Sequence, residues 1–374
     1  MSLEIKAVKT RAELKKFVRF YTELYKNNQQ VAIPLHMDEL ATLSSKNPAM
    51  EHCEMQLFLA IEDGKIVGRI ACIVNKHECE KEKQQVGRFG WFDFVDKPEV
   101  SEALMATAID WFQKRNIIKV HGPFGFTDLD RQGMLIEGFE EVSTFATIYN
   151  YKYYQQHIES LGFKKQTDWL EYKIFAKGGS FERVQKISDF VAHKYQLNEV
   201  KLHSKRDLKR YISKVFQLLN ICYQDLYGYV ALTEKQMKHY ADMFLFLVKL
   251  DFLSLIENKD GELIGFGIAM PSFSQATQKA KGKIAPLGWY HLIKAMKKND
   301  TLDLYLLAVL PEYQNKGVNA MIMSKIMNSA LKFGIEQAES NIELEDNKKV
   351  QQMWRLFEHE QHKRRRCYYK NLVS

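Results

Sequence analysis

The chain has 374 residues, of which 46% are hydrophobic and 27% charged, with a formal net charge of +8. This composition excludes a disordered chain and leaves room for two domains of ordinary size. We expect no signal peptide, and the most apolar run, 243–256, is too short and too charged to span a membrane. The five cysteines are scattered and form no C-x-x-C pair, so we expect a cytoplasmic protein without a metal site.

The first half of the chain alternates strand and helix patterns. A Glu62-Asp63-Gly64-Lys65 turn is typical of a β-hairpin, and Pro98 is typical of a helix start. The predicted elements are a strand over 3–8, a helix over 11–27, a hairpin of 55–61 and 66–74, a strand over 86–95, a helix over 98–115 and a strand over 117–121.

The second half repeats this order after a linker-like break at Ala176–Ser180. The predicted elements are a strand over 199–203, helices over 207–223 and 233–249, a hairpin of 252–257 and 263–270, an insert at 272–299, and then a strand, a turn and a helix. We therefore predict an α/β (α+β) fold with two tandem domains, 1–176 and 181–374. Each would have a mixed, mostly antiparallel sheet flanked by helices.

The segment 306–319 joins an apolar strand to a helix through a turn that contains Pro311 and Gly317. The helix is predicted from an apolar stripe that recurs every four residues, at Val318, Ile322, Ile326 and Ala330. A turn of this kind exposes backbone N–H groups at the positive end of a helix dipole, so it predicts an anion site. An ordinary strand–loop–helix connection is the alternative.

Residues 309–319 resemble the pyrophosphate-binding motif of the GNAT superfamily of acyl-CoA-dependent N-acyltransferases. Pro311, Tyr313, Gln314 and Gly317 stand at the expected steps, and Asn319 replaces the last small residue of the motif. The resemblance implies that acetyl-CoA or another acyl-CoA is the co-substrate. The residues it assigns to the cofactor are Val309, Leu310, Gln314, Asn315, Lys316, Gly317, Val318 and Asn319.

The segment after this helix is predicted to be a strand over 337–344, followed by a helix that Asp346 or Asn347 caps. By the same resemblance Asn347 contacts the pantetheine arm, and a plain cap is compatible with that role. Many family members have a tyrosine seven residues later that protonates the leaving thiolate. Here the residue is Trp354, so either another group is the acid or the thiolate leaves without one.

The expected reaction is attack of an amine on a thioester. The resemblance implies a backbone N–H of Val309 or Leu310 as oxyanion donor. Alternation would place Asp303 and Tyr305 on one face of the strand before the turn, together with residues 301, 307 and 309. In the same way, Glu339 would lie on the polar face of the next strand. We predict Glu339 or Asp303 as the base and Tyr305 as the residue that positions the amine, although ordinary strand side chains would give the same pattern.

The sequence leaves the identity of the amine acceptor open. Tyr227 and Tyr229 lie where the family often binds its acceptor, but aromatic packing around a turn would explain them equally well. The whole-chain pattern resembles a bacterial group with ceramide-synthase-like members, which leaves a small-molecule or a lipid amine open. The basic run 363–366 fits a solvated strand, a phosphorylated ligand or peripheral membrane contact, and no motif points to nucleic acid.

The first half is expected to be a degenerate family domain. Residues 150–163 resemble the helix and Gly-Phe element of the family, but Asp96 and Glu99 stand where a pyrophosphate would bind. Two alternatives to an acyltransferase stay open: a non-catalytic CoA- or lipid-binding protein, and an aminoacyl-tRNA-dependent transferase of similar paired fold.

Overall fold

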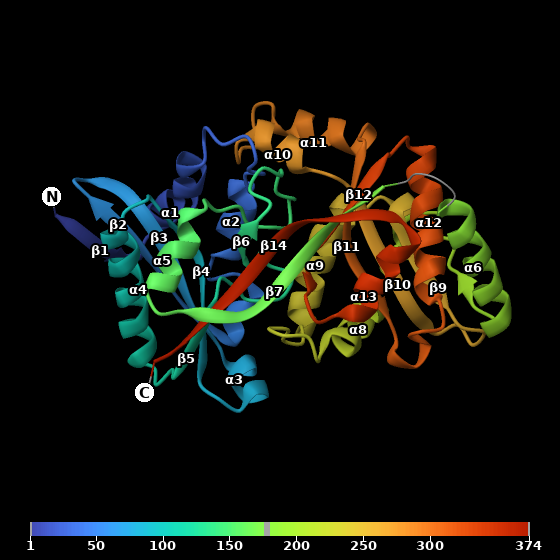
Figure 1. Ribbon diagram of the computed structural model, residues 1–374, viewed down its shortest axis with the longest axis horizontal. Helices are drawn as coiled ribbons and strands as arrows, with labels where there is room; N and C mark the ends of the chain where they lie inside the picture. The colour runs from blue at the N-terminus through green and yellow to red at the C-terminus, as the bar shows by residue number, and fades with distance from the viewer. Residues whose placement is uncertain (1, 176–179, 373–374) are drawn as a thin grey trace. The chain divides into compact units, whose positions relative to one another are not determined.

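The computed structural model describes residues 2–175 and 180–372, which form two compact units (Figure 1). Unit 1 contains Met1–Leu170, Phe273–Lys294 and Lys363–Ser374. Unit 2 contains Glu171–Ser272 and Ala295–His362. Apart from Ser180, the predicted linker lies outside the described residues.

The sheet of unit 1 has the order β1-β2-β3-β4-β5-β14, with β6 paired to β14. Its neighbours are antiparallel except β4 and β5, which are parallel. The strands are β1 (Leu3–Ala7), β2 (Cys53–Glu62), β3 (Lys65–Asn75), β4 (Val86–Phe94), β5 (Lys119–Gly122), β6 (Met134–Glu137) and the unit-1 part of β14 (Glu358–Asn371).

Two cores cover the two faces of this sheet. One contains side chains of α4 (Pro98–Gln113), and the other contains side chains of α1 (Arg11–Leu24). A capping box between Thr10 and Glu13 explains why α1 begins where it does. The other helices of unit 1 are α2 (His36–Thr42), η1 (Pro48–Glu51), α3 (Lys76–Glu82), α5 (Tyr153–Ser160), α10 (Ser274–Ala280) and the first seven residues of α11 (Gly288–Lys297).

The sheet of unit 2 has the order β8-β9-β10-β11-β12-β7, with β13 paired to β7. Its only parallel pair among the described residues is β11 with β12. The strands are β8 (Asn198–Glu199), β9 (Leu253–Glu257), β10 (Leu263–Pro271), β11 (Thr301–Val309), β12 (Gln337–Ser340), β13 (Glu343–Leu344) and the unit-2 part of β7 (Lys164–Phe175).

The main helix of unit 2 is α12 (Val318–Lys332), which packs on the sheet together with α6 (Ser180–Tyr195). The predicted stripe of Val318, Ile322, Ile326 and Ala330 is buried in this core, so that prediction is confirmed. The other helices are α7 (Lys205–Lys209), α8 (Ile212–Tyr223), α9 (Glu234–Leu247), η2 (Leu250–Phe252), η3 (Pro311–Tyr313), α13 (Lys348–Met353) and η4 (Trp354–Leu356).

Each half of the sequence contributes its last strand to the sheet of the other unit. Residues 337–339 of β12 pair with 173–175 of β7, and residues 119–122 of β5 pair with 368–371 of β14. Residues 273–294, which belong to the second half, also fold with unit 1. The compact units therefore divide the chain differently from the predicted domains 1–176 and 181–374, which stay a prediction about the two sequence halves.

The predicted fold class is confirmed, but several element predictions are wrong. The strand expected over 199–203 is reduced to the two residues of β8, and the helix expected over 207–223 is interrupted between α7 and α8. Helices α2, α3 and α6 are missing from the prediction. The strand expected over 337–344 is divided, because the side chain of Asn341 accepts the N–H of Ile342 and donates to the Tyr305 carbonyl.

The basic run 363–366 is not a solvated surface. Lys363 and Arg365 are buried, and Arg364 and Arg366 both bind the carboxylate of Asp168, at 3.2 Å and 2.8 Å. These cations are therefore held by packing and ion pairing inside unit 1, and the predicted outward-facing strand is wrong.

Candidate active site

The candidate site begins where β11 and β12 separate. The two strands pair in parallel only over Thr301–Leu304 and Gln337–Ser340. The next residue of the second strand, Asn341, donates its N–H to the Leu304 carbonyl and its side-chain amide to the Tyr305 carbonyl. Beyond this point β11 pairs with β10 alone within the described part of the chain. Its C-terminal half therefore has one open edge.

A β-bulge at Tyr305 changes the direction of the side chains along β11. Leu304 and Leu306 lie opposite consecutive residues of β10, so Tyr305 is the extra residue. As a result Leu302 and Leu304 before the bulge, and Leu307 and Val309 after it, all pack in the α12 core. The predicted alternation, which placed 307 and 309 on the face of Asp303, is wrong for this reason.

The two predicted oxyanion donors differ in their backbone partners. The Leu310 N–H donates to the Ile264 carbonyl at 2.9 Å and is therefore committed to β10. Val309 lies opposite Gly265 in the alternate register position, so its N–H and carbonyl point to the open edge of β11. The Val309 carbonyl accepts from the Gln314 side chain at 3.1 Å and from the Cys222 thiol at 3.3 Å.

The turn between β11 and α12 has two residues in the left-handed region, Asn315 with φ +60° and Gly317 with φ +84°. A Cβ on Gly317 would lie 2.8 Å from a methyl group of Val191 on α6. Glycine is thus required here by the left-handed backbone and by the close approach of α6. Among the residues that the structure describes, no side chain caps α12, whose first turn begins with the backbone N–H groups of Val318 and Asn319.

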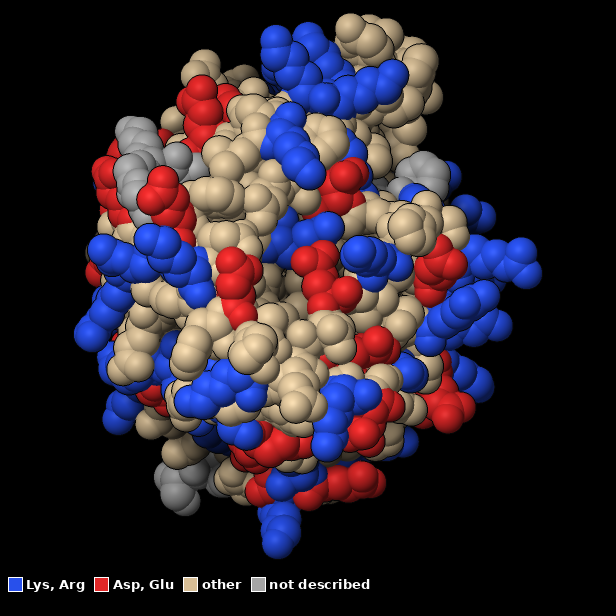
Figure 2. Space-filling model, turned by 90° about the vertical axis from the view of Figure 1, so that its right-hand side faces the viewer, with Lys and Arg blue, Asp and Glu red and all other residues tan. Residues whose placement is uncertain are grey.

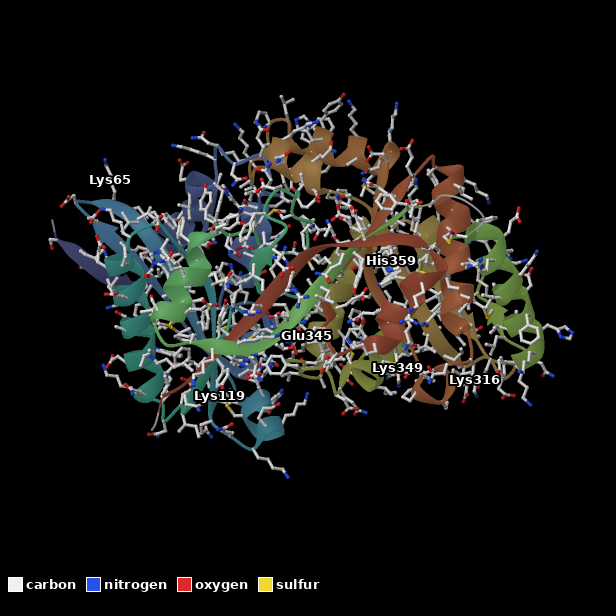
Figure 3. The ribbon with its side chains drawn as sticks, in the orientation of Figure 1. Lys65, Lys119, Lys316, Glu345, Lys349 and His359 are labelled. Carbon is white, nitrogen blue, oxygen red and sulfur yellow. The ribbon has the colours of Figure 1, made fainter. Side chains whose placement is uncertain are left out.

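Two lysines lie beside this turn (Figure 3). The Lys316 ammonium lies over the rings of Tyr195 and Tyr313, with distances of 5.5 Å and 5.0 Å to the ring centroids. Lys349, on α13, donates to the Gln314 side chain at 3.1 Å. Gln314 therefore links the strand end to α13, and the lysines add positive charge near the start of α12.

The predicted carboxylates lie together on the sheet of unit 2. Asp303 and Glu339 are register partners on the parallel strands, so they share one face. His362 places its Nε2 atom 3.6 Å from a Glu339 carboxylate oxygen, and its side chain is 3% exposed. The structure thus brings together two residues that the sequence analysis selected and adds a histidine that it missed.

Besides His362, the sequence analysis also missed a third carboxyl group, that of Glu343. Trp354 donates its indole N–H to both carboxylate oxygens of Glu343, at 2.9 Å and 3.1 Å. Burial raises the pKa of Glu343 to about 8, although the hydrogen bond from Trp354 acts in the opposite direction. The residue in the position of the expected tyrosine therefore holds a carboxyl group whose pKa is well above its ordinary value.

The remaining predicted residues have less specific surroundings. Asn347 occupies the cap position of α13 without a capping hydrogen bond from its side chain, and Asn319 is half-buried in the first turn of α12. Tyr229 is buried and donates to Asn220 at 2.6 Å, which favours packing around the turn, whereas Tyr227 is half-buried. Tyr223, which the sequence analysis did not select, donates to the Leu307 carbonyl at the open edge.

An apolar cavity of about 100 Å³ lies between α12, the N-terminal half of β11 and β12. Leu302, Leu304 and Ala338 line it from the strands, and Met323 and Met327 line it from the helix. Among the described residues, no group of His, Cys, Asp or Glu side chains could hold a metal ion, and no helix is long and apolar enough to cross a membrane.

Comparison with known proteins finds a family match in the second half of the chain. Residues 212–358 match the model of the acetyltransferase (GNAT) family. This match includes β11, the turn, α12 and the carboxylates Asp303, Glu339 and Glu343. The chain therefore carries a GNAT domain in its second half, and the predicted family is confirmed.

Two relatives align over nearly the whole chain. Protein YghO of Escherichia coli (strain K12) is 27% identical over 367 residues, which cover 96% of this chain and 93% of the relative. A bacterial ceramide synthase of Caulobacter vibrioides is 27% identical over 359 residues, which cover 92% of this chain and 91% of the relative.

Solved structures show the same fold. A tandem GNAT protein from the clavulanic acid biosynthesis pathway has a TM-score of 0.59 at 11% identity. The alignment covers 100% of this chain and 99% of that protein. A GCN5-related N-acetyltransferase from Sphaerobacter thermophilus has a TM-score of 0.54 at 8% identity. This alignment covers 99% of this chain and 96% of that protein. The chain thus has the fold of a tandem GNAT protein.

Proposed function

We propose that the chain is an acyl-CoA-dependent N-acyltransferase with one CoA site, in unit 2. The observation that carries this proposal is the open edge of β11 followed by the left-handed turn and the uncapped start of α12. Backbone N–H groups at a helix start bind phosphate, and an open strand edge supplies peptide groups to a ligand such as pantetheine. Lys316 and Lys349 would contribute to binding of the CoA phosphates.

In the proposed reaction the amine nitrogen attacks the thioester carbonyl carbon, a C–N bond forms and the C–S bond breaks. The Val309 N–H, on the open edge, would stabilise the oxyanion. Glu339, with His362 beside it and Asp303 on the neighbouring strand, would accept the proton that the ammonium group loses. Tyr305 at the bulge would position the amine, as the sequence suggested.

Glu343 is proposed as the group that protonates the leaving thiolate. A carboxyl group with a pKa of about 8 is protonated at neutral pH and can act as a general acid there. Trp354 holds it through two hydrogen bonds. The tryptophan that replaces the expected tyrosine would then orient the acid and take no part in proton transfer itself.

For the acceptor we propose an amphiphilic lipid amine and for the donor a long-chain acyl-CoA. The relative named bacterial ceramide synthase supports this choice, because it aligns with more than nine tenths of the chain. We further propose a cytoplasmic location, from the cysteine content, and a degenerate N-terminal half that binds no CoA.

The test is calorimetric titration with acetyl-CoA and with palmitoyl-CoA, followed by an assay of thiol release with a long-chain amino alcohol and with a small water-soluble amine. We expect one site per chain, tighter binding of palmitoyl-CoA, and thiol release with the long-chain amine only. Binding without thiol release from any amine would indicate a non-catalytic CoA-binding protein. No binding of either thioester would overturn the proposal.

A further inference from the structure

The insert before β11 forms a surface that the proposed reaction does not explain. It folds as α10 and α11, and residues 273–294 belong to unit 1. Four large apolar side chains are exposed at the start of α11: Leu287 (63%), Trp289 (51%), Tyr290 (50%) and Ile293 (44%). Trp289 and Ile293 are four residues apart, so they lie on one side of the helix.

The charges around these side chains all have one sign. Residues 273–298 contain six lysines and no aspartate or glutamate. Lys279, Lys281, Lys283 and Lys294 are exposed. At the top of the view in Figure 2, where α10 and α11 lie in Figure 1, Lys and Arg side chains stand beside uncharged ones. We call the four apolar residues with these four lysines the α11 patch.

The α11 patch rests on a buried base. Phe273, directly before α10, and Thr277 of α10 are buried, and the Gly282 carbonyl accepts the N–H of His36 at 2.8 Å. The N–H of Trp289 donates to the Ile284 carbonyl at 2.9 Å, which ties the start of α11 to the end of the preceding loop. The exposed apolar side chains therefore belong to a segment that is packed into unit 1.

We propose that the α11 patch docks on an anionic lipid bilayer. A helix that exposes Trp, Leu and Ile between lysines inserts its apolar side chains at the level of the headgroups, while the ammonium groups bind lipid phosphates. Trp and Tyr are the residues that prefer this interface.

Two other occupants fit the patch less well. A second copy of the chain, related by a two-fold axis, would bring the same lysines face to face without any acidic residue of the insert to balance them. Nucleic acid would match the charge but leave Leu287 and Ile293 without an apolar partner. A bilayer satisfies both the charge and the apolar side chains.

Vesicle co-sedimentation of the full-length protein tests this inference, and because it needs neither CoA nor an amine its outcome is independent of the proposed reaction. We expect binding to phosphatidylcholine vesicles that contain phosphatidylglycerol, and at least about tenfold weaker binding to phosphatidylcholine alone or in high salt. The double variant Trp289→Glu, Ile293→Glu should lose binding. Phe190→Glu on α6, which changes an equally exposed aromatic residue (62%), should retain it.

The charge is tested separately. Lys283→Glu should weaken binding to the anionic vesicles about tenfold, whereas Lys65→Glu, at the start of β3, should not. Circular dichroism and thermal unfolding would verify that each variant is folded. Absence of vesicle binding, or binding that the double variant retains, would overturn the proposal. If wild type were a dimer that the double variant converts to a monomer, the patch would be a contact between two copies instead.

Discussion

The two halves of the chain end their central strands in different ways. In unit 1, β4 runs parallel to β5 and ends at Phe94, just as β11 runs parallel to β12 and ends at Val309 in unit 2. The Phe94 N–H donates to the Tyr154 hydroxyl at 3.0 Å, and the Tyr153 hydroxyl donates to the Phe94 carbonyl at 2.5 Å. Helix α5, which follows β5 and β6 in the chain, therefore uses both peptide groups of this strand end.

In unit 2 the corresponding helix, α13, leads to Trp354, whose N–H goes to Glu343. The Val309 N–H stays directed to the open edge of β11. Similar strand and helix orders therefore produce a strand end whose N–H and carbonyl both bind tyrosine hydroxyls in unit 1, and one whose N–H points to an open strand edge in unit 2. The difference lies in the side chains of α5 and α13, and it is the reason for proposing a CoA site in unit 2 alone.

The largest effect is expected from the polar core of unit 1. Asp93 is buried and binds Arg69 at 2.7 Å. Asp93→Ala should lower the free energy of unfolding by about 3–5 kcal/mol, because it leaves a guanidinium group buried without its partner. Urea unfolding measures this, and CoA affinity of the folded protein should be unchanged. Asp110→Ala, which removes the exposed partner of Lys114, is the control and should change stability little. A loss of CoA binding in folded Asp93→Ala would place a ligand site in unit 1.

The next largest effect should be on catalysis in unit 2. Glu339→Gln removes the proposed base and should lower kcat about 10²-fold or more, with little loss of stability. Glu336→Gln, the same chemical change at an exposed position three residues earlier, should be close to wild type. Initial rates of thiol release measure both variants. Equal rates for wild type and Glu339→Gln would remove Glu339 from the mechanism.

A smaller effect is expected on cofactor affinity. Lys316→Glu and Lys349→Glu should each raise the Kd for CoA about tenfold, because each reverses a charge beside the proposed phosphate site. Lys119→Glu in unit 1 is a close control, since the Lys119 ammonium also lies over an aromatic ring, that of Tyr369, at 4.9 Å (Figure 3). Titration calorimetry should find Lys119→Glu unchanged. If it weakened binding as much as the other two, the effect would be one of net charge alone.

The smallest effect concerns pH. Burial raises the pKa of Glu343 to about 8 from an ordinary value of 4.5, so the folded protein holds a proton that the unfolded chain releases between these values. Stability should therefore fall as pH rises from about 4.5 to about 8, and Glu343→Gln should lack this part of the slope. As the proposed acid, Glu343 should also make kcat decline above pH 8.

Glu343→Gln should have a several-fold lower kcat, and its kcat should not decline above pH 8. The control is Asp346→Asn, the same kind of change at an exposed position three residues later. A decline of kcat above pH 8 that persists in Glu343→Gln would assign the titration to another group.

Local sequence signals were sufficient for much of the fold. The Asp63-Gly64 turn, Pro98 and the four-residue stripe of α12 each act over a few residues, and the structure contains the hairpin, the helix start and the buried stripe where they were predicted. Asp303 and Glu339 were selected by alternation before the bulge, where the period of two still holds, and they are neighbours in the structure.

The predictions that were wrong or missing depend on partners far away in the sequence. The bulge at Tyr305 arises in the pairing with β10, and it reverses the facing of 307 and 309. The basic run is buried because Asp168, almost two hundred residues earlier, binds two of its arginines. Glu343 and His362 had no signal of their own, because their surroundings come from Trp354 and from the pairing of distant strands.

The sequence by itself determined the order of elements, the glycine-bearing turn before α12 and the family resemblance, because these depend on periodicity and on short-range backbone preferences. Only the tertiary structure decided which peptide groups are open at the strand ends, which carboxyl groups are buried, and that α11 presents apolar side chains between lysines. Hydrogen-bond partners, desolvation and exposure are properties of contacts between segments that are distant in the chain, and no local pattern contains them.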